Sequence, residues 1–89
     1  MFAKVYETEK YGQILAKIDS AETDNESGAE VRFYFHPEGL GVCSVALFFP
    51  DTDKGWDGSD KFFLGLDREQ CENIVGPSFE KVATFAGQE

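Results

Sequence analysis

The residues whose types and spacing could best bind a ligand are the carboxylates of an Asp- and Gly-rich segment, residues 50–60. Carboxylate oxygens are hard ligands that suit Ca²⁺. An EF-hand loop begun at Asp51 fails, however, because Trp56 stands where Gly belongs and Phe62 stands where the bidentate Glu belongs. We therefore predict a solvated turn with Asp caps, with no metal site and no cofactor. The carboxylates of this segment are Asp51, Asp53, Asp57 and Asp60.

The single tryptophan, Trp56, lies in the middle of this polar segment. Tryptophan is enriched at binding hot spots, so Trp56 is a candidate anchor for a partner. Its ring can also fold back as a lid on the edge of a sheet. We favour the lid and keep the hot spot as the alternative.

The charge balance of the chain limits the partners that it can bind. It has 17 acidic and 8 basic residues, a net charge of -9 and a pI near 4.4. Direct binding to DNA, RNA or an anionic membrane requires patches of Lys and Arg, so we expect none of these. A basic protein partner or a divalent cation remains compatible with the charge, and solubility alone is its simplest explanation.

Acidic residues gather in two parts of the sequence, on either side of an apolar centre. If both groups share one face, their spacing could imitate a phosphate backbone and occupy the groove of a nucleic-acid-binding protein. The first group is Glu7, Glu9, Asp19, Glu22, Asp24 and Glu26, and the second is Asp51, Asp53, Asp57, Asp60, Asp67, Glu69 and Glu72. The predicted partner-binding residues are Glu22, Asp24, Glu26, Asp51, Asp53, Asp57, Asp60, Asp67 and Glu69.

In size and acidity alone, the chain resembles the small DNA-mimic inhibitors carried by phages, including some anti-CRISPR and anti-restriction proteins. Such inhibitors share no common motif, and the chain matches none, so no functional residue carries over from the resemblance. What the resemblance implies is a class of function, the inhibition of a nucleic-acid-binding protein.

Catalytic patterns are missing from the sequence, which has no GxSxG, P-loop, GxGxxG or HExxH motif. The only histidine, His36, and the two cysteines, Cys43 and Cys71, lack the spacing of a zinc site. Both cysteines fall in apolar patterns, so we predict small buried hydrophobes and not a disulfide. We therefore predict a protein that is not an enzyme.

The central part of the sequence predicts a β-hairpin, residues 30–49. Residues 31–35 alternate, with Val31, Phe33 and Phe35 on the core side. Residues 42–49 are apolar on both faces, which predicts the central strand of a sheet. Arg32, Tyr34 and His36 share the opposite face, where they could grip a carboxylate or phosphate, although ordinary outward-facing residues are the simpler interpretation.

Another hairpin precedes this one, and helices follow it. Strand-like alternation over residues 2–8 and 13–20 surrounds a turn at Gly12, and a polar loop, residues 21–29, leads to the central hairpin. Residues 61–66 are predicted as a fifth strand.

Asp67 is expected to cap a helix that ends at residues 76–77, and Ser78 a second, shorter one. The predicted fold is α+β, one domain over residues 1–89: a twisted antiparallel β-sheet of four to five strands, built from two consecutive hairpins, with one or two C-terminal helices packed on one face.

These observations predict a small, acidic, non-enzymatic protein-binding module. The leading hypothesis is a nucleic-acid mimic that presents carboxylates to a basic groove of its partner. The alternative is a structural or homodimerising module that uses a Phe-rich sheet face, and a divalent-cation-binding module ranks third. Since no signal pattern and no apolar run of roughly 18 residues is present, we expect a cytoplasmic protein.

Overall fold

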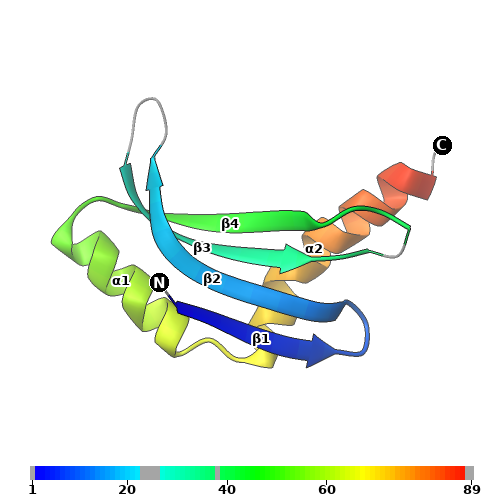
Figure 1. The fold of residues 1–89 in the computed structure, drawn as a ribbon, viewed down its shortest axis with the longest axis horizontal. Helices are drawn as coiled ribbons and strands as arrows, with labels where there is room; N and C mark the ends of the chain where they lie inside the picture. The colour runs from blue at the N-terminus through cyan, green and yellow to red at the C-terminus, as the bar shows by residue number, and fades with distance from the viewer. Residues whose placement is uncertain (1, 23–26, 38, 88–89) are drawn as a thin grey trace.

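A computed structural model describes residues 2–22, 27–37 and 39–87, with the side chains of Phe2 and of residues 82–87 left out. The described residues form a four-stranded antiparallel sheet followed by two helices, which is the α+β arrangement that the sequence predicted (Figure 1). The strands are β1 (Phe2–Thr8), β2 (Gly12–Glu22), β3 (Ser27–Phe35) and β4 (Cys43–Pro50), and the helices are α1 (Asp53–Leu64) and α2 (Arg68–Gly87).

The strands follow one another across the sheet in the order β1-β2-β3-β4. The two predicted hairpins are present, and β2 also pairs with β3. Gly12 has a φ of 72° and Gly39 a φ of 80°, in the left-handed region that a residue without Cβ adopts at little cost. Each strand thus pairs with its neighbour in sequence. Within each strand, the side chains of successive residues point to opposite faces of the sheet.

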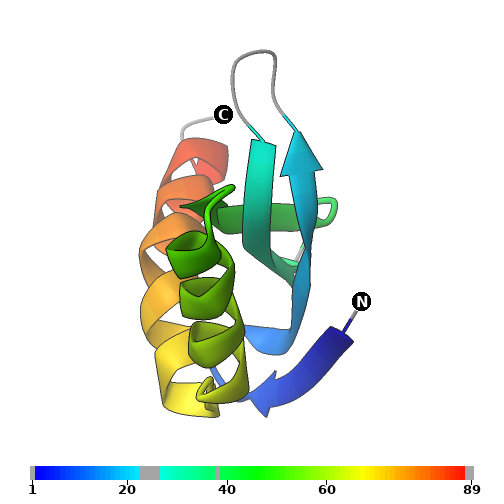
Figure 2. The same cartoon turned by 90° about the vertical axis from the view of Figure 1, so that its left-hand side faces the viewer.

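Both helices cover the same face of the sheet, so the molecule has two layers (Figure 2). The prediction that Val31, Phe33 and Phe35 face the core is confirmed, because all three side chains are buried. Across the layer they meet apolar side chains from the helices. The remaining buried apolar residues are Tyr11, Ile14, Ala16, Ile18, Ala29, Phe63, Leu66, Cys71 and Val75. The opposite face of the sheet has no described helix over it; we call it the open face.

The prediction that residues 42–49 form the central strand is wrong, because β4 lies at the edge of the sheet. Its residues that face the helices, among them Val45 and Leu47, are only partly buried, and Phe48 on the open face is 40% exposed. Apolar residues on both faces of a strand predict that both faces are covered. They do not specify whether a neighbouring strand pairs with each of its two edges.

The prediction of a fifth strand over residues 61–66 is also wrong, because α1 extends to Leu64. The helix begins where the Thr52 hydroxyl accepts a hydrogen bond from the Gly55 amide at 3.0 Å, an N-cap. Gly58 costs a helix only about 1 kcal/mol relative to Ala, and packing of the apolar stripe against the sheet outweighs that cost. The buried residues of α1 are Gly55, Ser59 and Phe63, spaced by four.

The predicted start of α2 is confirmed by a reciprocal pair of hydrogen bonds. Oδ1 of Asp67 accepts from the Gln70 amide at 2.8 Å, and Oε1 of Gln70 accepts from the Asp67 amide at 3.3 Å. This is a capping box, which satisfies two amides that have no partner inside the helix.

The predicted end of this helix at residues 76–77 is wrong, because α2 continues through Pro77 to Gly87. Ser78, which was expected to cap a separate helix, therefore lies inside α2. Proline removes one intrahelical hydrogen bond, and aromatic packing beyond it offsets the loss. The Phe79 ring lies 5.1 Å from the Tyr11 ring and 6.1 Å from the Phe35 ring, measured between centroids.

The predicted polar loop over residues 21–29 is shorter than expected. β2 continues to Glu22, and β3 begins at Ser27, with Glu22 paired to Ser27. Backbone pairing extends strand structure into polar residues that the sequence pattern assigns to a loop. In the described part of the chain, neither helix is long and apolar enough to cross a bilayer.

Candidate functional site

Three residues of the predicted acidic site lie on the exposed face of α1. Asp53, Asp57 and Asp60 are spaced by four and three residues, which places them on one side of a helix. All three are exposed, and Trp56 lies beside them, at the margin of this face. The prediction that Trp56 belongs to a polar turn is therefore wrong, since it is a helical residue.

Trp56 is fixed by a hydrogen bond to the residue that follows β4. Its indole Nε1 donates to Oδ1 of Asp51 at 2.9 Å, and the Ser27 hydroxyl donates to Oδ2 of the same carboxylate at 3.0 Å. These two bonds, the one from Trp56 first, lower the pKa of Asp51 from its ordinary value. Asp51 is therefore held as a carboxylate, and Trp56 remains 36% exposed.

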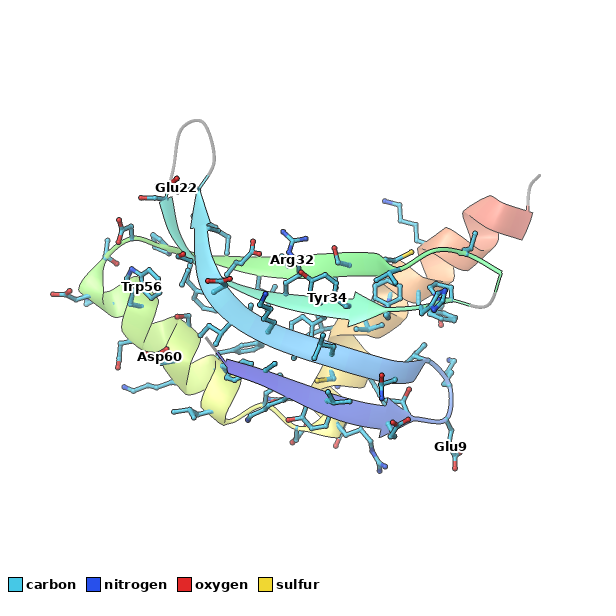
Figure 3. The ribbon with its side chains drawn as sticks, viewed as in Figure 1. Glu9, Glu22, Arg32, Tyr34, Trp56 and Asp60 are labelled. Atoms are coloured by element: carbon cyan, nitrogen blue, oxygen red, sulfur yellow. The ribbon has the colours of Figure 1, made fainter. Side chains whose placement is uncertain are left out.

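Beside the indole lies a polar hollow of about 370 Å³ between the β2–β3 hairpin and the start of α1. Two acidic residues, Glu22 and Asp51, line it together with Trp56, Ser20 and Ser27. We call it the Trp56 hollow. Figure 3 shows Glu22 and Trp56 at the same end of the molecule. The hollow combines negative charge with an exposed aromatic ring.

The structure does not bring all of the predicted acidic residues to this end. Asp67 and Glu69 lie beyond the far end of α1, which is about 18 Å long at 1.5 Å per residue. Asp67 is also occupied by capping α2. Glu9 lies at the opposite end of the molecule from Glu22 (Figure 3). Asp24 and Glu26 lie outside the described residues.

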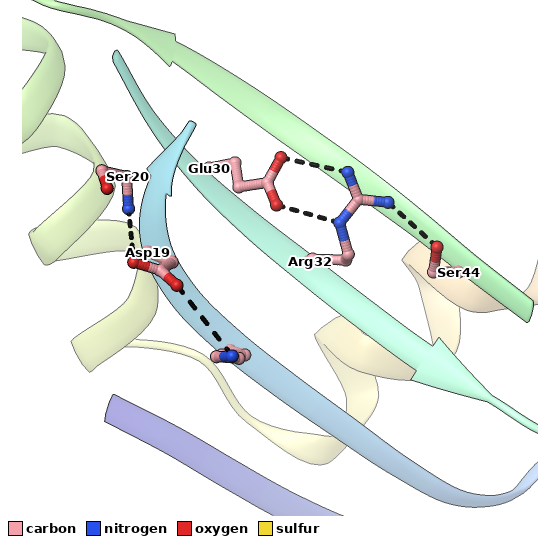
Figure 4. A network of polar contacts seen from close by, with 6 residues as sticks. Asp19, Ser20, Glu30, Arg32 and Ser44 are labelled. Carbon is pink, nitrogen blue, oxygen red and sulfur yellow. Dashed lines mark hydrogen bonds and ion pairs between the residues drawn. The ribbon is translucent and has the colours of Figure 1, made fainter. Parts of the chain in front are cut away.

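The open face carries cations that are already paired. Arg32 donates from Nε and Nη2 to the Glu30 carboxylate, at 2.9 and 3.1 Å, and from Nη1 to the Ser44 hydroxyl at 2.9 Å (Figure 4). Lys17 lies 3.9 Å from Asp19. The guanidinium of Arg32 has its bidentate partner within the chain, so it is poorly suited to grip an external carboxylate.

Tyr34 and His36, the other members of the predicted Arg32 set, line a shallow groove on the open face near Lys17 and Val42. The groove has a volume of about 650 Å³. The His36 ring lies with Nε2 2.6 Å from the Leu40 carbonyl oxygen. Within the set, Arg32 is thus directed to Glu30 and only Tyr34 and His36 face this groove.

The cysteines are free, and they differ in burial. Cys71 is fully buried, as predicted, and burial raises the pKa of its thiol to about 11, so the thiol is protonated at neutral pH. Cys43 is half-buried on the edge strand, which corrects the prediction that it is buried. Over residues 2–22, 27–37 and 39–87, no three His, Cys, Asp or Glu side chains are grouped so that they could hold a metal ion.

The fold is that of a small α+β protein, a four-stranded antiparallel meander with two helices on one face of the sheet. The chain matches no protein-family model, no curated protein and no solved structure with statistical significance.

The Trp56 hollow was missed in the sequence because its residues are far apart in the chain. Glu22 and Asp51 approach one another because β3 pairs with both neighbours: Glu22 lies opposite Ser27, and Gly28 lies opposite Pro50. The helical spacing of the three aspartates around Trp56 was a usable signal. It was masked by the glycines of the segment, which favour a turn.

Proposed function

We propose that this protein is a non-enzymatic binding module that presents the exposed acidic face of α1 and the Trp56 hollow to a basic surface of a partner protein. The observation that carries the proposal is the grouping of Glu22, Asp51 and the partly exposed Trp56 around one hollow. The three exposed aspartates of α1 extend the negative surface along the helix.

The chemistry of the hollow suits an Arg or Lys side chain. A carboxylate accepts charge-assisted hydrogen bonds from a guanidinium or ammonium group, and an indole attracts the same cation through its π-face. Asp51 is already ionised and oriented by Trp56 and Ser27, so little reorganisation is needed when a cation enters. A groove that normally binds nucleic acid offers many such cations, which makes a nucleic-acid-binding protein the proposed class of partner.

The alternative, dimerisation through a Phe-rich sheet face, has less support from the geometry. Phe33 and Phe35 lie in the core beneath the helices, and Phe49 packs toward the same layer. On the open face, Phe48 is the only phenylalanine of β4. The Phe-rich face of the sheet is therefore the face that the helices cover, and not a surface left free for a partner.

The proposal is tested by charge reversal at two ends of the molecule. Immobilised wild type captures partner proteins from the native host, which are identified by mass spectrometry and then purified. Their association is measured against ionic strength for wild type and for Asp57→Lys with Asp60→Lys. We expect affinity to fall steeply as NaCl rises, with the association rate falling first, and to fall by at least about tenfold in the double variant.

The matched control is Glu7→Lys with Glu9→Lys. Two reversals change the net charge from -9 to -5 in either variant, but Glu9 lies at the opposite end from Glu22. The control should retain most of the affinity, and double-stranded nucleic acid should compete for the partner. An affinity that is flat in salt, or weakened equally by both double variants, would show that the acidic end is not the binding surface.

A further inference from the structure

The outer edge of β4 lacks the features that usually keep a strand edge from pairing. An edge strand presents N–H and C=O groups that have no ladder partner, and proteins commonly protect such edges with charged residues, proline or bulges. From Gly39 to Pro50 the chain has no charged residue, although 28% of its residues are charged. Pairing with β3 runs without a bulge from Cys43 to Pro50, and the only proline is the last residue of the strand.

The other edge of the sheet is different. β1 contains Lys4 and Glu7, and contacts from its side chains hold the end of α1 and the connection that follows it against β1. The Lys4 ammonium donates to the carbonyl oxygens of Phe63 and Leu64, at 2.8 and 3.2 Å. The Tyr6 hydroxyl donates to the carbonyl oxygen of Leu66 at 2.7 Å. Of the two edges, β4 alone is uncharged along its length.

Side chains along β4 also remain incompletely covered. Val45 and Leu47 are partly exposed, whereas Phe33 and Val31, their partners on β3, are fully buried. On the open face, Phe48 is 40% exposed. One more strand placed beyond β4 would cover apolar side chains on both faces at once, because side chains of neighbouring strands contact one another across the ladder.

We propose that β4 pairs antiparallel with β4 of a second copy of this chain, so that two four-stranded sheets join into one of eight strands. A two-fold axis at Ala46 places Ser44 opposite Phe48 of the partner subunit, and Val45 opposite Leu47 of the partner subunit. Such an interface is self-complementary, as a symmetric dimer requires.

Charge favours a second copy over a basic partner at this edge. Each copy carries a net charge of -9, so two copies repel one another, and the repulsion is weakest where the contacting surfaces are themselves uncharged. β4 provides such a surface, and a basic protein would gain no charge complementarity from it. Salt therefore acts oppositely at the two surfaces: it strengthens the β4 dimer by screening repulsion, and it weakens binding of a basic partner at α1.

Sedimentation of the full chain from about 10 µM to about 1 mM tests the proposal. We expect the mass to rise from 9.9 kDa toward twice that value with concentration, and at lower concentration when NaCl is raised. Phe48→Lys should weaken dimerisation by at least about tenfold, although it lowers the negative charge of each copy.

Val5→Lys is the matched control, because Val5 is 55% exposed on the same face of the sheet but on β1. It should dimerise like wild type. Ser44→Glu is a second edge variant, at an exposed position beside Arg32, in case Phe48→Lys does not fold. Slowed hydrogen exchange of β4 amides at high concentration would support the pairing. A wild type that stays monomeric to about 1 mM, or equal weakening by Val5→Lys and the edge variants, would overturn it.

Discussion

The indole nitrogen of Trp56 donates a hydrogen bond to Oδ1 of Asp51 at 2.9 Å, and this bond ties the first turn of α1 to the residue that follows β4. The other oxygen of the carboxylate accepts from Ser27 at the start of β3. One side chain thus joins a helix, a strand end and the β2–β3 hairpin. The hollow that we assign to a basic partner depends on this bond.

The first prediction concerns the protonation of Asp51. In Trp56→Phe an aromatic ring is retained but the N–H donor is lost, so the pKa of Asp51, lowered mainly by that bond, should rise toward its ordinary value of 3.8. A carboxyl whose pKa is lowered in the folded state stabilises the fold above its unfolded pKa, and that contribution disappears as pH falls through the folded pKa. The destabilisation caused by Trp56→Phe should therefore be larger at pH 7 than in strong acid.

Titration of the Asp51 carboxyl carbon by NMR, in wild type and Trp56→Phe, measures this effect directly. Ser27→Ala is the companion variant, because it removes the second hydrogen bond and should raise the pKa by less. An Asp51 pKa that is unchanged in Trp56→Phe would mean that the bond is not formed in solution.

The second prediction concerns the two faces of β3. Phe33 is fully buried, so Phe33→Ala should cost about 3–5 kcal/mol of unfolding free energy, a large part of the stability of a small domain. Tyr34, the next residue, lies on the open face, and Tyr34→Ala should cost far less. Urea unfolding of both variants makes the comparison. Similar losses at the two positions would contradict the assigned register of the sheet.

The third prediction compares two glycines of α1. A Cβ at Gly55 would overlap the carbonyl oxygen of Pro50, a backbone atom that cannot move aside cheaply. Gly55→Ala should therefore destabilise the fold by about 2 kcal/mol or more, although Ala is the better helix former.

Gly58 is the control on the same helix. The nearest atom to its Cβ would be Cδ2 of Phe49 at 3.8 Å, an ordinary contact. Gly58→Ala should stabilise the fold by up to about 1 kcal/mol, because Ala loses less backbone entropy in a helix. Thermal unfolding of both variants measures the difference. Opposite signs for the two substitutions are expected, and equal stabilisation would contradict the close approach of α1 to the end of β4.

The fourth prediction concerns thiol reactivity. Cys71 is fully buried and its thiol pKa is raised to about 11, so only about one thiol in a thousand would be ionised at pH 8. Cys43, half-buried with Sγ 3.6 Å from the Gly41 carbonyl oxygen, should react first with a disulfide reagent in the native protein. In Cys43→Ser, rapid labelling should appear only after denaturant is added. Fast native labelling of that variant would show that the core around Cys71 opens readily.

Local patterns in the sequence were sufficient for several elements. The alternation of residues 31–35 predicted which side chains of β3 are buried, because side chains of a strand alternate between its faces. Asp67 and Gln70 predicted the start of α2, because their hydrogen bonds involve amides only three residues away. Each of these signals is contained within a few neighbouring residues.

Features that depend on distant neighbours could not be predicted in this way. The apolar run of β4 did not show that the strand lies at an edge, since hydrophobicity does not record which strands are adjacent. Gly58 and Pro77 favoured a turn and a helix end, but packing of Phe63 and Phe79 against the sheet outweighed those local preferences. Local propensity is a weak term beside the burial of a helix face.

The candidate site shows the same division. Its negative charge and its tryptophan are evident in the composition, and the sequence alone determined that the chain is acidic, with a net charge of -9. Only the tertiary structure decided which carboxylates lie together. Glu22 and Asp51 share a hollow because β3 pairs with β2 on one side and with β4 on the other, whereas Asp67 follows α1 and is separated from them by the length of that helix.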